Sequence, residues 1–321
     1  MKLPRRAFLQ LAAVAALPRL AWAQAYPIRP VRTIVGLAAG GAADILARLI
    51  AQWLSERLGQ PFVIENRVGA GGNIAADAVM HAAADGYTLL LVTNAHAINA
   101  SLYDRPNFNV VRDIAPVAGI DREPFLMLVN PTFPAKTIPD FIAYAKTNAG
   151  KVNMASAGNG SASHVSGELF KLMAGVNLLH VPYRGGAPVL TDLIGGQVHV
   201  TFLPTTGTIE YVRSGALRAL AVTTATRSPT LPDTPTVGEF LPGYESSAWF
   251  GIGAPKNTPA DLVDKLNKEI NTGLADPGIK ERLANFGGTV LAGSPSEFGK
   301  LIAVETEKWA KVVKFAGMKP D

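Results

Sequence analysis

The sequence predicts an α/β protein of two lobes, each built around a largely parallel sheet. Short runs of β-branched and apolar residues alternate with amphipathic helical runs over most of the chain, a pattern typical of strand–helix–strand units. The strand-like runs form two series, one before and one after position 125. Without a 23-residue leader, 298 of the 321 residues remain, and that length favours two domains over one.

The first series contains three predicted strands, at 33–37, 62–65 and 88–93. After the first strand, apolar residues recur at i, i+3 and i+4 from Ile45 to Leu58, which predicts a helix with one apolar stripe against the sheet. We expect Gly59, which is followed closely by a proline, to end that helix.

The second series predicts strands at 152–156, 178–182, 198–202 and 217–223. Two further apolar segments are bounded by proline and stand apart from the alternation: FLMLVNP at 125–131 and WFGIGAP at 249–255. We interpret them as strands where the chain crosses between the lobes. Lobe 1 would then combine residues 24–124 with 246–321, and lobe 2 would comprise residues 125–245.

Two helix starts near the C-terminus carry capping signals. Thr258 precedes a proline and then Asp261, and Ser294 precedes a proline and then Glu297. A hydroxyl, a proline in the first turn and an acid three residues on are typical of a helix N-terminus. We expect Thr258 and Ser294 to cap the helices that follow them.

Residues 1–23 have the three parts of an export signal. A basic start is followed by the apolar run 11–17 and by the tripeptide Ala-Trp-Ala, which ends at Ala23, where we expect cleavage. Arg5 and Arg6 resemble a twin-arginine signal, and an ordinary basic start on the general export route stays open. After the signal no apolar stretch approaches the roughly 18 residues of a transmembrane helix, so we expect a soluble protein outside the cytoplasm.

The charge balance argues against a nucleic-acid partner. The leader holds four of the 30 basic residues and no acidic one, so 26 basic residues remain against 25 acidic ones, and the net charge falls from +5 to about +1. No run of Lys or Arg occurs elsewhere, whereas nucleic-acid-binding domains present a clustered basic face. The chain has no cysteine, which excludes disulfides, a thiolate nucleophile and a cysteine metal site.

Loops rich in glycine and small residues follow several predicted strands and lead directly into helices. The first loop contains Gly40, Gly41, Ala42, Ala43 and Asp44, and its echo in the second series contains Gly185, Gly186, Ala187 and Pro188. A third loop carries Ser156, Gly158, Asn159, Gly160, Ser161 and His164, and a further loop offers Thr93 and Asn94.

These loops predict an anion site that uses backbone N–H groups. Ligands of open parallel sheets lie at the carboxyl ends of the strands, where such loops converge. Each helix start presents unpaired N–H groups and about half a positive charge. Two helix starts that face each other across a cleft can bind one carboxylate without an arginine. One glycine pair alone would indicate only a tight turn, whereas several such loops favour a shared site.

Other kinds of site fit the sequence less well. The segment 69–74 lacks the last glycine of the dinucleotide motif, and no glycine loop ends in Gly-Lys-Ser or Gly-Lys-Thr. Ser161 lacks the following glycine of a hydrolase elbow, so we expect its hydroxyl to cap the helix whose first turn contains His164. The five histidines are scattered without metal-ligand spacing.

Three side chains near the loops are further candidates, and two of them have two interpretations each. Asp44 stands four residues before Arg48, so we favour an ion pair along the helix over catalysis. Arg184 is either a counter-charge for the ligand or a solvated loop residue. Tyr183 is a candidate for the wall of the cleft.

Several long motifs run in order from Tyr26 nearly to the C-terminus: YPIRPVRTIVG, GGAADILARLIAQWLSERLGQPFVIENRVGAGGNIAADAV, ADGYTLLLVT, ASAGNGSASH, VPYRGGAPVLTDLIGGQV, LRALAVTTATRSPTLPDTPTVGEF and W-x-G-x-x-A-P-x-x-T-P. Together these motifs resemble the Bug family, the periplasmic solute-binding proteins of tripartite tricarboxylate transport systems. The resemblance implies a two-lobed type II periplasmic binding protein fold of the Venus flytrap kind, with a narrow cleft between the lobes. It also implies small carboxylates or related compounds as ligands.

The resemblance further implies which loops hold the ligand. The 40–44 loop of one lobe and the 156–164 and 183–188 loops of the other would hold its carboxylate, partly through waters. Family members often carry Thr or Ser where this chain has Ala42 and Ala43, so backbone contacts would remain and hydroxyl contacts would be lost. Many members carry Asp where this chain has His199 and Leu203. Leu203 makes a cleft-facing position apolar, which disfavours a polar or amino-bearing ligand.

The residues and the resemblance together predict a monomeric periplasmic receptor for a small organic acid. It would need no cofactor or metal, perform no chemistry and deliver its ligand to membrane transporter subunits. Two alternatives remain. The partner could instead be the extracellular domain of a sensor kinase, and a secreted hydrolase would use Ser161 and His164.

Overall fold

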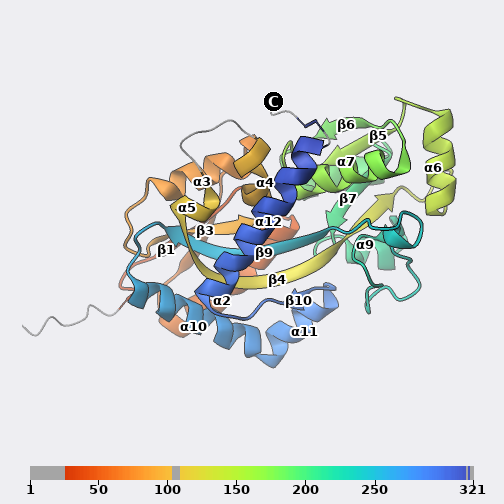
Figure 1. The fold of residues 1–321 in the computed structure, drawn as a ribbon. Helices are drawn as coiled ribbons and strands as arrows, with labels where there is room; N and C mark the ends of the chain where they lie inside the picture. Colours follow the sequence, from red (N-terminus) through yellow and green to blue (C-terminus); the bar gives the residue numbers. More distant parts are fainter. Residues whose placement is uncertain (1–25, 103–108, 316, 319–321) are drawn as a thin grey trace, which may run out of the picture.

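The structure is a computed structural model that describes residues 26–102, 109–315 and 317–318. The predicted export signal lies outside the described residues. Two groups of strands are covered by helices, and β4 and β9 run side by side between them (Figure 1). Within the described part of the chain, no helix has both the length and the apolar character needed to cross a membrane.

The first group of strands is parallel and has the order β2-β1-β3. It comprises β1 (Val31–Val35), β2 (Phe62–Asn66) and β3 (Thr88–Thr93), close to the predicted positions. Helix α2 (Ala42–Leu58) follows β1 and buries the predicted apolar stripe. Gly59 ends α2 in the left-handed conformation, with a φ of 71°, as glycine commonly does at helix ends. The short η1 (Ala70–Gly72) and α3 (Asn73–Met80) lead to β3.

The second group is also parallel and has the order β7-β5-β6. Its strands are β5 (Asn153–Ser156), β6 (Leu179–Pro182) and β7 (Val200–Pro204), and β8 (Arg218–Val222) pairs with β4. Helix α6 (Ile138–Thr147) precedes β5, and α7 (Ala162–Ala174) and α8 (Gly186–Ile194) connect the three parallel strands. The predicted parallel pairing is thus confirmed for three strands in each group, whereas the strand predicted at 217–223 is β8, which is antiparallel to β4.

One long strand joins the two groups. β4 (Ile114–Val129) pairs antiparallel with β9 (Ser247–Pro255) as far as Pro124, and with β7 from Phe125 onward. Eight of the ten described strands therefore form one continuous path, and β8 and β10 pair with β4 beside it, so the two predicted sheets are joined through β4. The prediction that this strand begins at 125 is wrong. The sequence pattern misses the first half of the strand because that half contains prolines and glycine. The register shifts after Pro116 and after Gly119, and such bulges accommodate residues that a regular strand would exclude.

The remaining elements pack around this path. They are α4 (Asn94–Leu102), α5 (Val110–Asp113), α9 (Ile209–Arg213), η2 (Val237–Glu239), α10 (Ala260–Ala275), α11 (Pro277–Asn285), β10 (Thr289–Val290) and α12 (Pro295–Phe315). Helix α12 crosses the molecule and packs against α4 and β4 (Figure 1).

The two predicted caps near the C-terminus have different outcomes. The Ser294 cap is confirmed, because its hydroxyl accepts the Glu297 N–H and the Glu297 carboxylate accepts the Ser294 N–H. The Thr258 cap is wrong. Its hydroxyl donates to the Pro255 carbonyl at 2.7 Å, and α10 begins without a side-chain cap.

Two carboxyl groups are buried on β4 next to the point where this strand changes partner. Asp121 and Glu123 are 0% and 1% exposed. Oε2 of Glu123 accepts the Thr205 hydroxyl and the Thr206 N–H. Both oxygens of Asp121 and Oε1 of Glu123 have no hydrogen-bond partner among the described residues. Burial raises the pKa of both carboxyls, and the neighbouring Glu123 raises the pKa of Asp121 further.

Asp121→Asn is expected to make the folded protein less sensitive to alkaline pH. A carboxyl with a raised pKa in the folded state favours folding below its unfolded pKa, near pH 4, and this contribution is lost as the pH rises through the folded pKa. Raising the pH should therefore lower the Tm of the wild type more than the Tm of the variant, and at about pH 9 the variant should be more stable by at least about 3 °C.

Thermal unfolding between acid and alkaline pH measures this difference. Asp264→Asn is the matched control, because Asp264 is exposed on α10. Parallel profiles of Tm against pH for the wild type and both variants would contradict the role of the buried pair.

Candidate functional site

Four parallel strands are followed by helices whose N-termini meet around one cavity. β1 leads into α2, β3 into α4, β5 into α7 and β6 into α8. The cavity has a volume of about 60 Å³, room for roughly four water molecules. The described residues that line it are Leu37, Gly41, Ala42, Ala43, Thr93, Asn94, Ala95, Phe125, Ala157, Ser161, Ala162, Ser163, Gly186, Leu203, Pro204, Ala248 and Phe250. None of these residues has a charged side chain.

The starts of α2 and α8 approach each other closely. A Cβ atom at Gly41 would lie 3.5 Å from the Gly186 nitrogen. No side chain caps the first turn of either helix, so the first N–H groups of both helices lack the partner that a cap supplies. The two N-termini direct partial positive charge into a space walled by glycine and alanine. A small anion fits this arrangement without a cationic side chain.

The starts of α7 and α4 contribute hydroxyl and amide groups to the same cavity. Ser161 accepts the His164 N–H at 3.3 Å, which confirms the predicted cap of α7. Ser163 accepts the Ala157 N–H at 2.8 Å. The Asn94 side chain donates to the Ser247 carbonyl and accepts the Trp249 N–H, so it fixes the start of α4 to β9.

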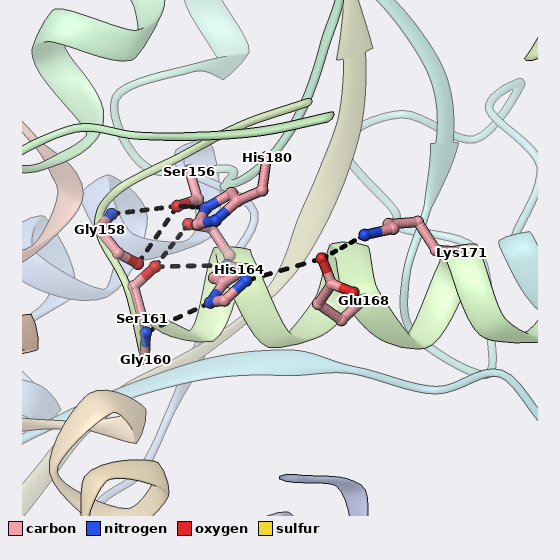
Figure 2. A network of polar contacts seen from close by, with 9 residues as sticks. Ser156, Gly158, Gly160, Ser161, His164, Glu168, Lys171 and His180 are labelled. Carbon is pink, nitrogen blue, oxygen red and sulfur yellow. Dashed lines mark hydrogen bonds and ion pairs between the residues drawn. The ribbon is translucent and has the colours of Figure 1, made fainter. Parts of the chain in front are cut away.

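A hydrogen-bond network holds the third loop in shape (Figure 2). Nδ1 of His164 accepts the Gly160 N–H at 3.3 Å, and Nε2 of His164 lies 3.6 Å from Glu168. The His164 and His180 rings stack with their centroids 3.7 Å apart, and Nε2 of His180 lies 2.6 Å from the Ser156 hydroxyl oxygen. Burial lowers the pKa of His180 to about 3, so this ring is neutral at neutral pH.

Ser161 and His164 do not have the geometry of a nucleophile and its base. The bond between them joins the Ser161 hydroxyl to the backbone N–H of His164. The two ring nitrogens of His164 face Gly160 and Glu168 instead. A nucleophile needs the ring nitrogen of its base within hydrogen-bond reach, so the pair serves here as a helix cap.

Asp44 supports the first loop and does not line the cavity. Its carboxylate accepts hydrogen bonds from the Gly40 N–H, the Arg48 guanidinium and the Asn66 amide, and the predicted ion pair with Arg48 is confirmed. Burial would raise the pKa of Asp44, but these hydrogen bonds outweigh it and hold the pKa below its usual value. The carboxylate oxygens of Asp44 therefore already accept hydrogen bonds from the protein.

The structure divides the predicted site residues into three sets. The cavity is lined by Gly41, Ala42, Ala43, Thr93, Asn94, Ser161, Gly186 and Leu203. A neighbouring cavity of about 410 Å³, which shares Leu37 and Ala157 with the first, is lined by Gly158, Asn159 and Tyr183, together with the exposed Arg184. The other predicted residues lie in the same loops outside both linings: Gly40, Asp44, Ser156, Gly160, His164, Gly185, Ala187 and Pro188.

Sequence reasoning missed most of the apolar part of the cavity wall and one serine. The residues missed are Leu37, Ala95, Phe125, Ala157, Ala162, Ser163, Pro204, Ala248 and Phe250. Phe125 and Phe250 could have been predicted as cavity residues. They lie in the segments 125–131 and 249–255, which we interpret as crossing strands, and strands that cross between two lobes lie at the base of a cleft. Among the described residues, no group of three His, Cys, Asp or Glu side chains could hold a metal ion.

Comparison with known proteins gives one family. The profile described as "Tripartite tricarboxylate transporter family receptor" matches residues 46–318. BugT of Bordetella pertussis is 37% identical over 300 residues, which cover 92% of this chain and 92% of BugT. The solved structure of the periplasmic binding protein BugD matches with a TM-score of 0.89 and 39% sequence identity. The solved structure of R. palustris Rpa4515 with adipate matches with a TM-score of 0.89 and 40% sequence identity. Each structural match covers 92% of this chain and 100% of the other.

Gly185→Ala is expected to weaken anion binding between α2 and α8. Gly185 has a φ of 139°, and a Cβ atom there would lie 2.7 Å from the Ala38 nitrogen, which donates to the Arg184 carbonyl at 3.0 Å. The added methyl group must push the 185–188 loop away from Ala38. We expect a loss of about tenfold in affinity, comparable to one hydrogen bond.

Isothermal titration with acetate, the simplest carboxylate, measures this loss. Gly196→Ala is the matched control, because Gly196 also has a positive φ, 71°, but no atom lies within 4 Å of an added Cβ. Equal affinity in Gly185→Ala and the wild type would show that the approach of the loops does not matter for anion binding.

Proposed function

Because this chain belongs to the tripartite tricarboxylate transporter receptor family, we propose that it captures a small carboxylate-bearing molecule between its two lobes and delivers it to a membrane transporter of that type. The family match and the α/β fold, shared with periplasmic binding proteins, were both predicted and are confirmed. The capture and delivery are the proposal.

The observation that carries the proposal is the meeting of four helix N-termini at a cavity whose described walls have no charged side chain. The uncapped starts of α2 and α8 offer N–H groups to a carboxylate, and hydrogen bonds to an ionised acceptor are stronger than those to a neutral one. The adipate bound to Rpa4515, a protein of the same fold, supports a carboxylate as the ligand here.

The energy that such a receptor needs is within reach of these groups. Micromolar affinity corresponds to about −8 kcal/mol, and each hydrogen bond to a charged group contributes roughly 1.5–3 kcal/mol. Several N–H groups plus the desolvation of the cavity can supply that energy after the cost of closing the lobes. We assign the anion-contacting role to the 40–44, 156–164 and 183–188 loops and to Thr93 and Asn94.

The lobe division that we propose follows the crossing strands. Residues 24–124 and 246–321 form lobe 1, and residues 125–245 form lobe 2. The change of β4 from β9 to β7 between Pro124 and Phe125 supports this division. Contacts between loops on either side support closure on the ligand, since the Ala38 N–H donates to the Arg184 carbonyl.

We also propose that the protein is exported, cleaved near Ala23 and monomeric in the periplasm. The similar structure of BugD, a periplasmic binding protein, supports this location. It acts without a cofactor and without catalysis. A sensor kinase's extracellular domain is the second candidate partner. Affinity capture with solubilised membrane proteins distinguishes the two, since recovery of transporter subunits supports delivery and recovery of a sensor kinase supports sensing.

A thermal-shift screen of residues 24–321 with mono- and dicarboxylates is expected to show stabilisation by at least one compound. A ligand that binds only the folded state raises the free energy of unfolding by about 2.7 kcal/mol at a hundredfold excess over its Kd. Matched uncharged amides of the same acids serve as controls and should give no shift. No stabilisation across a broad carboxylate panel would overturn the proposed ligand class.

Ser161→Ala distinguishes a receptor from a hydrolase. Loss of the α7 cap should lower stability by about 1 kcal/mol and weaken carboxylate binding, and neither protein should hydrolyse p-nitrophenyl acetate above background. Ser214→Ala, at an exposed serine, is the control for non-specific effects. Hydrolysis by the wild type that disappears in Ser161→Ala would support the hydrolase and contradict the receptor.

A further inference from the structure

Four consecutive residues between β2 and α3 have positive φ angles. They are Gly69, Ala70, Gly71 and Gly72, with φ of 135°, 45°, 60° and 94°. Glycine adopts such angles freely, but alanine does so at a cost, because its Cβ atom crowds the backbone. Backbone of this kind persists where the surrounding structure holds it in place. Residues 69–72, which we call the glycine turn, are held by two neighbouring segments.

Helix α4 holds the glycine turn from one side. Nδ2 of Asn99 donates to the Gly71 carbonyl at 2.8 Å, and Asn99 is 2% exposed. Nε2 of the buried His96 lies 3.4 Å from the position of a Cβ on Gly72. Nδ1 of His96 accepts the Thr93 N–H, and burial lowers the pKa of His96 to about 4. The ring is therefore neutral and its proton is on Nε2, which faces the turn.

A loop of the other proposed lobe also contacts the glycine turn. A Cβ atom at Gly71 would lie 2.6 Å from the Asn159 carbonyl oxygen, so the two backbones are in close contact. The obstacle is main chain, which cannot rotate out of the way as a side chain can. Asn159 belongs to proposed lobe 2 and the glycine turn to proposed lobe 1, and both line the cavity of about 410 Å³. Gly71 and Asn159 therefore form a contact between the lobes, in addition to the one between Ala38 and Arg184.

The glycine turn is connected to the anion cavity without lining it. The helix that holds the turn begins at Asn94, which lines the cavity of about 60 Å³ together with Thr93. No residue of the glycine turn is among the described residues that line that cavity. A change in the turn can therefore alter the position of the lobes while every group that faces the anion keeps its chemistry.

We propose, on the basis of the proposed receptor function and lobe division, that the glycine turn is a closing contact of the receptor, and that Asn99 is the positioning residue that holds it against Asn159. The turn stabilises the closed arrangement of the lobes, and the loops around the smaller cavity bind the anion. A ligand that binds only when the lobes are closed loses apparent affinity in proportion to the closed fraction.

Gly71→Ala tests the closing contact. The added Cβ must displace the Asn159 carbonyl, so we expect the lobes to open. The radius of gyration in small-angle X-ray scattering should increase, and the affinity for acetate in isothermal titration should fall about tenfold. Gly175→Ala is the matched control, because Gly175 has nearly the same φ, 63°, but no atom lies within 4 Å of an added Cβ. It should carry the same backbone strain and keep the wild-type radius and affinity.

Scattering without ligand separates this inference from the receptor function. Equal radii of gyration for Gly71→Ala and Gly175→Ala would overturn the closing contact, whatever the two affinities are. If the wild type bound no carboxylate while Gly71→Ala alone had a larger radius, the receptor function would be overturned and the closing contact would stand. Circular dichroism checks that both variants are folded.

Asn99→Leu tests the positioning role and decides the question if Gly71→Ala does not fold. Leucine keeps the size of the side chain and removes the donor to the Gly71 carbonyl. The radius should increase and the acetate affinity should fall about fivefold, the scale of one hydrogen bond. Asn271→Leu is the matched control, because it removes a bond of 2.9 Å from Nδ2 to the Gly293 carbonyl and should lower only the Tm. If Asn99→Leu also lowered only the Tm, with wild-type radius and affinity, the positioning role would be overturned.

Discussion

The starts of α2 and α8, which no side chain caps, are the constraint on which the site depends. Backbone N–H groups buried without a partner are costly, and most helix starts meet this requirement with a side chain. Ser161 does so for α7 and Ser294 for α12, whereas α2 and α8 have no capping side chain. Backbone contacts hold the segments before these two starts. Asp44 accepts the Gly40 N–H, and the Ala38 N–H donates to the Arg184 carbonyl.

An anion site built from backbone differs from one built around arginine. Its N–H groups are present whatever the side chains are, so the anion-binding part tolerates substitution provided that the residues are small. The side chains around the helix starts are mainly leucine, phenylalanine and alanine, together with Thr93, Asn94, Ser161 and Ser163. In a site of this kind, selectivity depends on such side chains.

Sequence reasoning succeeded where a structure depends on residues a few positions apart. The apolar stripe of α2, the stop at Gly59, the Asp44–Arg48 pair and the Ser161 cap all follow from local spacing. It failed where the structure depends on distant pairing. The first half of β4 has proline and glycine and forms a strand only because β9 lies beside it. Phe125 and Phe250 are far apart in the chain and come together only through that pairing. Thr258 shows a different limit, because a carbonyl three residues back competes with the helix for its hydroxyl.

β4 also contains both the point where the two strand groups meet and the two buried carboxyl groups. A strand that belongs to both groups must bend or twist within itself if one group turns relative to the other, and its partner changes between Pro124 and Phe125. Asp121 and Glu123 lie just before that point and have almost no contact with solvent. If a bend admitted water there, it would reduce the burial that raises the pKa of both carboxyls, and protons would be released. The angle of the strand and the ionisation of the pair would then be coupled, and each would shift the other.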